Sequence, residues 1–249
     1  MRARNIVVIL IAVVTAAVCI RLGVWQLDRR HQRQELNALV EARMQLPPIG
    51  SLADLVAIDT SSARYRAVAL TGSYDFANEF VLVHRTSRGS PGVNILTPLR
   101  VPGDERAVLV NRGWVYAPDG VTVDLEQWRQ PAEATVRGYA LPIPSWGEGS
   151  GVQARSLRRL DLAFLTERSP YPLAHVIVVD TSGAAAVSER VPGRLGPVTL
   201  DEGPHLSYAM QWFSFAAIAL IGVGIMVWRD RQQQSSQQVN DVVGAGVPG

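Results

Sequence analysis

The chain has 249 residues, a formal net charge of +2 and a mean hydropathy of +0.10. Its 24 basic residues are all arginines and form no dense run of the kind that follows a phosphate backbone, so nucleic acid is not an expected partner. A single cysteine excludes a disulfide framework and a four-thiolate zinc site. The use of arginine alone indicates the codon bias of a GC-rich bacterium.

The first apolar stretch, residues 6–27, is long enough to be a transmembrane helix. At about 1.5 Å per residue, twenty residues cross the roughly 30 Å core of a bilayer, and Arg21 can extend its side chain to the headgroups. A cleaved signal peptide is the alternative, because Arg2 and Arg4 precede the apolar run. No A-x-A-like site follows the run, so the sequence favours an uncleaved anchor.

The cysteine, Cys19, lies inside this first stretch. A lipoprotein signal would place a small residue before it, whereas Val18 stands there, and a copper-delivery site would need a second thiol. Cys19 is therefore predicted to be a buried residue without chemistry of its own.

The second transmembrane helix is predicted over residues 205–228, of which residues 209–228 carry no charge. Two spans place both termini on one side of the membrane and residues 28–204 on the other. Arginines at both termini favour cytoplasmic ends, but Arg29, Arg30 and Arg33 oppose the positive-inside rule, so the charges leave the orientation open. The polar tail, residues 229–249, has low complexity and is predicted to be disordered.

The region between the spans is predicted to be an α+β domain with a mainly antiparallel sheet. Residues 28–44 are rich in helix formers and continue the first helix until Pro47 and Pro48. One further helix is expected over residues 157–167, and a loop over residues 181–203. Strands are predicted at residues 65–74, 80–86, 93–101, 106–116, 135–141 and 175–180, and their short spacing favours hairpins.

Signatures of the common enzyme classes are missing from the sequence. There is no phosphate-binding G-x-x-x-x-G-K-[ST] loop, no H-x-x-x-H metal spacing, no G-x-S-x-G nucleophile elbow and no C-x-x-C-H haem attachment. The sequence therefore predicts a protein that is not an enzyme.

Three clusters could carry function, and each also has a structural explanation. Residues 23–29 end the first span, where Trp25 is typical of an interfacial anchor. Residues 108–115 suggest a buried strand that runs into an Asn-Arg-Gly turn or bulge. In the third cluster, His205, Tyr208 and Trp212 are spaced i, i+3 and i+7 and share one helical face. They could ligate and pack a metalloporphyrin, or form an aromatic belt with a capping histidine.

Taken together, these clusters resemble the Surfeit locus protein 1 family, the membrane assembly factors of haem-copper cytochrome c oxidase, and in particular a bacterial, actinobacterial member. The resemblance rests on Gly23, Trp25, Gln26 and Arg29; Tyr65-Arg66 leading to Gly72; Arg85; Thr97-Pro98; Val110-Asn111-Arg112-Gly113-Trp114; and His205-Leu206 with Tyr208 and Trp212. The chain departs from the family pattern at Gly203-Pro204, where members often carry Asn or another polar residue.

The resemblance implies a plasma-membrane protein with cytoplasmic termini, including residues 1–5 and the tail, and an extracytoplasmic central domain. It implies a role in maturing the catalytic oxidase subunit, with haem a as a transient ligand and haem a synthase as a further candidate partner. His205 would bind the haem iron, and Tyr208, Trp212 and Trp25 would surround the ring. Arg29 or Arg112 would pair with the propionates, because arginine suits bidentate contact with carboxylates.

Two other functions remain open from the sequence. The protein could be a scaffold or accessory subunit of the respiratory oxidase that never binds haem, or an enzyme that acts on haem or lipid outside the membrane. The helix face of His205 distinguishes the first alternative from the haem hypothesis. A histidine directed towards the first helix favours haem, and one directed towards the headgroups favours a scaffold.

Overall fold

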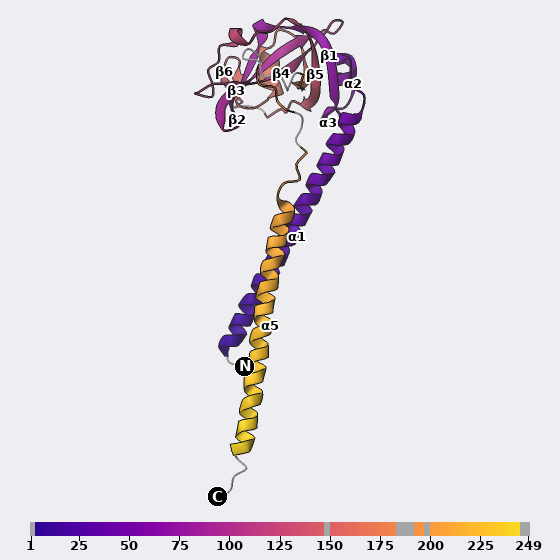
Figure 1. The fold of residues 1–249 in the computed structure, drawn as a ribbon. Helices are drawn as coiled ribbons and strands as arrows, with labels where there is room; N and C mark the ends of the chain where they lie inside the picture. Colours follow the sequence, from indigo (N-terminus) through magenta and orange to yellow (C-terminus); the bar gives the residue numbers. More distant parts are fainter. Residues whose placement is uncertain (1–2, 147–149, 183–191, 197–199, 245–249) are drawn as a thin grey trace. The chain divides into compact units, whose positions relative to one another are not determined.

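The computed structural model describes residues 3–146, 150–182, 192–196 and 200–244, with side chains placed as far as residue 233. The chain divides into two units. The helical unit comprises residues 1–38 and 200–249, and the β-domain comprises residues 39–199. Figure 1 shows both units and labels the long helices α1 and α5 and the strands β1 to β6.

The helical unit contains most of α1 (Ala3–Gln45) and the whole of α5 (His205–Gly244). Both helices are long and apolar enough to cross a membrane, and only 17% and 6% of their most apolar windows are buried. Ile11 is 61% exposed and Ile218 is 66% exposed. Water does not favour such a surface and lipid does, so α1 and α5 are candidate membrane helices.

The ends of the two helices follow the prediction in one case and depart from it in the other. Helix α1 continues through residues 28–44 and ends just before Pro47, as expected. Helix α5, however, continues to Gly244, where the sequence analysis predicted a disordered tail from residue 229. Glutamine and arginine are good helix formers, and no proline interrupts the chain before Pro248, so the apolar span extends as a polar helix.

The β-domain is built on one sheet of eight strands among the described residues, in the order β1-β5-β8-β4-β3-β2-β7-β6. Strand β1 also pairs with β3 at Ser73 and Tyr74, so β1, β5, β8, β4 and β3 close a ring. The strands are β1 (Ala67–Tyr74), β2 (Phe80–Ser87), β3 (Ser90–Arg100), β4 (Ala107–Tyr116), β5 (Glu133–Pro142), β6 (Gly151–Gln153), β7 (Ser156–Leu157) and β8 (Leu173–Asp180). The short helices are α2 (Leu52–Ala57), α3 (Thr60–Ala63), η1 (Phe76–Asn78), η2 (Leu125–Trp128) and α4 (Leu162–Arg168).

The sheet of the described residues is mixed, with two parallel pairings among antiparallel ones. Strand β4 pairs with β8 in parallel, and β2 pairs with β7 in parallel. Parallel neighbours need a long crossover between them, and the segment that contains η2, β5 and α4 supplies it for β4 and β8. Six strands match predicted ones, whereas β6 and β7 were not predicted. The helix predicted at 157–167 is present as the shorter α4, which begins at Leu162.

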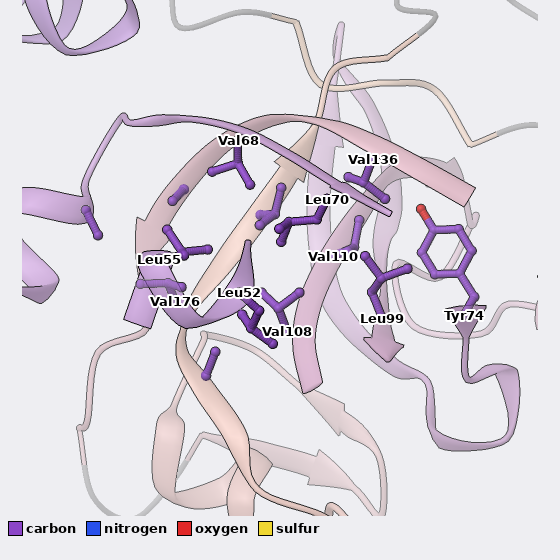
Figure 2. Packing of buried hydrophobic residues seen from close by; sticks show 14 residues of the cluster. Leu52, Leu55, Val68, Leu70, Tyr74, Leu99, Val108, Val110, Val136 and Val176 are labelled. Atoms are coloured by element: carbon purple, nitrogen blue, oxygen red, sulfur yellow. The ribbon is translucent and has the colours of Figure 1, made fainter. Parts of the chain in front are cut away.

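The core inside the closed ring is made of alternating residues of its strands. In β1, Val68, Leu70 and Tyr74 are buried and their neighbours are more exposed, which is the period of two of a strand with one face in the core. Figure 2 shows these side chains pointing towards those of β3, β4, β5 and β8. Leu52 and Leu55 of α2 join the same cluster, and Ser51 starts α2 by accepting a hydrogen bond from the Asp54 N–H at 3.0 Å.

The Asn-Arg-Gly sequence of β4 forms a bulge, as predicted. Gly113 pairs with Ile95 and Asn111 pairs with Leu96, so Arg112 is the extra residue on its strand. Gly113 has a φ of 127°, which a residue without a side chain adopts without strain. The bulge turns the Arg112 side chain into the domain, where its exposed fraction is 0%.

Arg112 is held inside the β-domain by an ion pair with Glu79. The Arg112 Nη1 atom lies 2.9 Å from Glu79 Oε1 and 3.3 Å from Thr97 Oγ1, and the other terminal nitrogen donates to the Trp128 carbonyl. Burial raises the pKa of Glu79 and lowers the pKa of Arg112, although each is opposed by the partner charge. Arg112 Nε and Glu79 Oε2 lack partners among the described residues. The pair is therefore costly to bury and costly to break.

We expect Arg112→Met to lower the free energy of unfolding by about 3–5 kcal/mol, because Glu79 would remain buried and charged without its partner. The double variant Glu79→Leu with Arg112→Met should recover most of that loss, since no charge is then buried. Denaturant titration of the full chain in neutral detergent measures both effects. Arg137→Gln, an exposed arginine of β5, is the control and should change stability by less than about 0.5 kcal/mol. If the loss of unfolding free energy in the double variant equalled the sum of the losses in the two single variants, Arg112 and Glu79 would not be energetically coupled.

Candidate functional site

The start of α5 contacts α1 through a hydrogen bond between two side chains. His205 Nδ1 lies 2.8 Å from Gln26 Oε1. With the amide in this orientation Oε1 accepts from Nδ1, and in the neutral imidazole with this tautomer Nε2 has the lone pair. This is the arrangement in which a second group orients an imidazole for binding through its other nitrogen. His205 is thus directed towards the first helix.

Nε2 of His205 lies beside a glycine. A Cβ atom added to Gly203 would be 3.3 Å from His205 Nε2. Gly203 also has a φ of 71°. A residue with a side chain would be strained in this backbone conformation even if there were room for its Cβ. Nε2 makes no hydrogen bond with the described residues. The residue before Pro204 therefore leaves the free imidazole nitrogen uncovered by a side chain.

The segment before α5 is fixed to α1 by Glu202. This carboxylate accepts from Arg30 Nε at 2.8 Å and from Gln34 Nε2 at 2.9 Å. The bonds from Gln34 and Arg30 hold the pKa of Glu202 below its usual range. Glu202 is three residues before His205, so these bonds and the Gln26 contact set the position of the imidazole relative to α1.

Small residues allow α1 and α5 to approach closely between Ala16 and Gly23 of α1. A Cβ at Gly23 would lie 2.6 Å from the Phe213 ring. Ala16, Cys19 and Ala216 form a buried cluster, with Trp212 packed against it. Close approach through small residues is the usual way for helices to associate in a membrane. Cys19 is buried and unpaired there, in agreement with the prediction.

The other predicted site residues of the helical unit have different surroundings. Trp212 is half-buried against α1, and Tyr208, on the same face by spacing, is 48% exposed. Trp25 is 43% exposed, and the Arg29 guanidinium lies 5.7 Å from its ring centre. Arg29 also donates to Gln32, so its cation remains without a carboxylate partner among the described residues. Two exposed rings and one accessible cation thus belong to the same unit as His205.

Arg112 does not belong to this group, which corrects the sequence-based assignment. Its side chain is fully buried in the β-domain and paired with Glu79. A propionate could reach it only by displacing that carboxylate from the interior. The Asn-Arg-Gly sequence therefore has a structural role in this chain, as its alternative interpretation proposed.

Comparison with known proteins identifies the family. A profile of the SURF1 family matches residues 13–217, which cover the whole β-domain, most of α1 and the first part of α5. The chain belongs to the SURF1 family. Members of this family are known generally as cytochrome oxidase assembly factors, and the predicted resemblance is confirmed.

Similar proteins come from bacteria and eukaryotes. A SURF1-like protein of Monosiga brevicollis is 26% identical over 216 residues, covering 80% of this chain and 79% of its own length. An uncharacterized SURF1-like protein of Mycobacterium tuberculosis is 28% identical over 222 residues, covering 84% and 78%. Surfeit locus protein 1 of Mus musculus is 30% identical over 108 residues, covering 38% and 35%. The mycobacterial similarity agrees with the prediction of an actinobacterial member.

Sequence reasoning placed Gln26 in a family motif but missed its role. Its partner, His205, is 179 positions away in the chain, so no local spacing pattern could join them. The contribution of Gly23 was missed for the same reason, because the clashing ring belongs to α5. A polar residue inside an apolar helix end is the signal that could have identified Gln26, since such residues pair across helices in membranes.

We expect Gly23→Leu to separate α1 from α5, because the added side chain would occupy the space of the Phe213 ring. In an Ala216→Cys background, Cys19 and the new cysteine belong to one buried cluster and should form an oxidative cross-link in membranes. Gly23→Leu should reduce the cross-linked fraction several-fold. Gly222→Leu is the matched control, because a Cβ there meets open space. Equal cross-linking in both leucine variants would show that the helices do not pack through Gly23.

Proposed function

We propose that this protein is an assembly factor for haem-copper cytochrome c oxidase that holds haem a on its way to the catalytic subunit. The observation that carries the proposal is the imidazole of His205, with Nδ1 oriented by Gln26 and Nε2 free beside Gly203. Haem iron accepts an axial imidazole nitrogen of this kind. Membership of the SURF1 family supports the connection to the oxidase.

The residues of the helical unit fit the chemistry of haem a. His205 would bind the iron through Nε2, while Gln26 holds the imidazole at its other nitrogen, Nδ1. Trp25 and Tyr208 offer exposed aromatic surface for the macrocycle, and Trp212 is partly buried against α1. Arg29 has a free guanidinium for a propionate. These residues bind and orient the cargo, and no chemical turnover by this chain is proposed.

The proposed topology puts α1 and α5 in the plasma membrane, both termini in the cytoplasm and the β-domain outside. The candidate site then lies where the helices leave the bilayer, at a depth that suits an amphipathic ring. The catalytic oxidase subunit is the proposed recipient, and haem a synthase is a proposed donor.

A scaffold without haem is the rival function, and one observation favours it. The His205–Gln26 bond and the Glu202 contacts are sufficient by themselves to join two helices, as interhelical hydrogen bonds do in membranes. In that case the apolar outer faces of α1 and α5 would contact the oxidase, and His205 would tolerate any residue that preserves packing.

The deciding experiment is a visible spectrum of the purified full chain after co-expression with the haem a biosynthetic enzymes. We expect haem a in the wild type, loss in His205→Ala, and retention in His31→Ala, which removes an exposed histidine of α1. Gln26→Leu keeps the ligand but removes its orienting bond, so the haem affinity should fall by about 10–100-fold.

Each result separates the two functions. A wild-type protein that co-purifies with the oxidase but carries no haem a would contradict the haem function and support the scaffold function. Haem a that persists in His205→Ala with an unchanged spectrum would sink the ligand assignment.

A further inference from the structure

The β-domain contains a second candidate site, a cavity of about 340 Å³ with three arginines in its lining. Arg64 follows α3, Arg85 lies on β2, and Arg159 precedes α4. The cavity lies wholly within the β-domain and shares no residue with the His205 site. Its volume is within the range of small-ligand sites.

The three guanidiniums lack carboxylate partners among the described residues. None of them belongs to an ion pair there. Arg85 donates to the carbonyls of Val83 and Arg158, and Arg64 donates to the Tyr65 hydroxyl. These neutral acceptors leave the positive charge uncompensated, and burial lowers the pKa of Arg85.

One acidic group, Asp161, is linked to Arg159 through a serine hydroxyl. Arg159 Nε donates to Ser150 Oγ at 3.2 Å, and that hydroxyl donates to the buried Asp161 carboxylate at 2.7 Å. Asp161 also caps α4 by accepting from the Ala163 N–H. Its charge is committed to the interior, so the cavity remains positively charged on its open side.

The backbone is strained where it presents two of these arginines. His84 has a φ of 54° and Tyr65 has a φ of 65°, values that residues with side chains rarely adopt. At His84 the pairing of β2 with β3 shifts between Leu82 and Arg85. In a regular strand, positions i and i+3 point to opposite faces, whereas this bulge brings Leu82 and Arg85 to the same cavity.

The rest of the lining is apolar. It comprises Leu82, Leu141, Pro142, Pro144, Trp146 and Leu160. Trp146 is half exposed and the Arg159 guanidinium lies 5.4 Å from its ring centre, so the cation and the apolar wall belong to one surface. Cations without counter-charges beside leucine and proline side chains are complementary to a ligand that is anionic at one end and apolar at the other.

We propose that this cavity binds a phosphate-headed amphiphile, with Arg64, Arg85 and Arg159 contacting the phosphate and the leucines contacting the chain. Guanidinium groups bind phosphate by paired, charge-assisted hydrogen bonds. A lipid headgroup and a smaller organic phosphate present the same chemistry. The proposal does not depend on haem binding at His205.

The test is isothermal titration calorimetry on the full chain in neutral detergent at low salt, with four probes. These are hexyl phosphate, dihexanoylphosphatidylglycerol, inorganic phosphate and hexanol. We expect saturable, one-to-one binding of hexyl phosphate, at least about tenfold tighter than inorganic phosphate or hexanol, because only an amphiphile uses both parts of the lining. Tighter binding of the phosphatidylglycerol than of hexyl phosphate would identify a lipid as the source, and the reverse order a soluble phosphate.

Variants assign the binding to the cavity. Arg64→Gln and Arg159→Gln remove exposed guanidiniums and should each weaken hexyl phosphate binding about tenfold. Arg85→Lys keeps the charge but not the paired donors, so it should weaken binding less than Arg85→Gln. Arg137→Gln, which removes the same charge elsewhere on the β-domain, should leave the affinity unchanged. The proposal is overturned if no anionic probe saturates, if inorganic phosphate binds as tightly as hexyl phosphate, or if Arg137→Gln weakens binding as much as the cavity variants.

Discussion

The buried ion pair between Arg112 and Glu79 constrains the β-domain, because neither charge can lose its partner there without a large cost. It joins the bulge of β4 to the start of β2, to Thr97 on β3 and to the carbonyl at the end of η2. The Arg112 guanidinium also lies near two aromatic rings. Its distance is 5.4 Å to the ring centre of Tyr74 and 5.2 Å to that of Phe76. The Arg112 carbonyl accepts from Arg194, which in turn pairs with Asp180 at the end of β8. One residue thus connects segments that are distant in sequence, and its hydrogen bonds fix how these segments meet.

The sequence could predict those features that depend on neighbouring residues. Alternating burial in β1, the continuation of α1 to Pro47 and the bulge at Gly113 all follow from local pattern and backbone freedom. It could not predict that β8 would lie parallel to β4, because that pairing depends on where a long connection returns. The polar end of α5 was misjudged because low complexity in a glutamine-rich segment indicates disorder and helix propensity at once.

The candidate haem site shows the same division between local and distant information. Spacing placed His205, Tyr208 and Trp212 on one face, and the two-helix arrangement was visible from hydropathy alone. The orienting contact of Gln26 and the close approach at Gly23 required the second helix to be in place. Glu202, which fixes the segment before α5, lies in a stretch that sequence reasoning treated only as a loop.

Arginine carries the positive charge throughout this chain, so residue type alone cannot distinguish its roles. Arg112 and Arg85 both stood out in the family resemblance, and both are desolvated. Arg112 faces a carboxylate, so its charge is satisfied within the domain and its loss would damage the fold. Arg85 faces only carbonyl oxygens beside an apolar cavity, which leaves a charge that an external anion can neutralise. The partner of each guanidinium, and not its position in a motif, therefore separates the structural arginine from the candidate ligand-binding one.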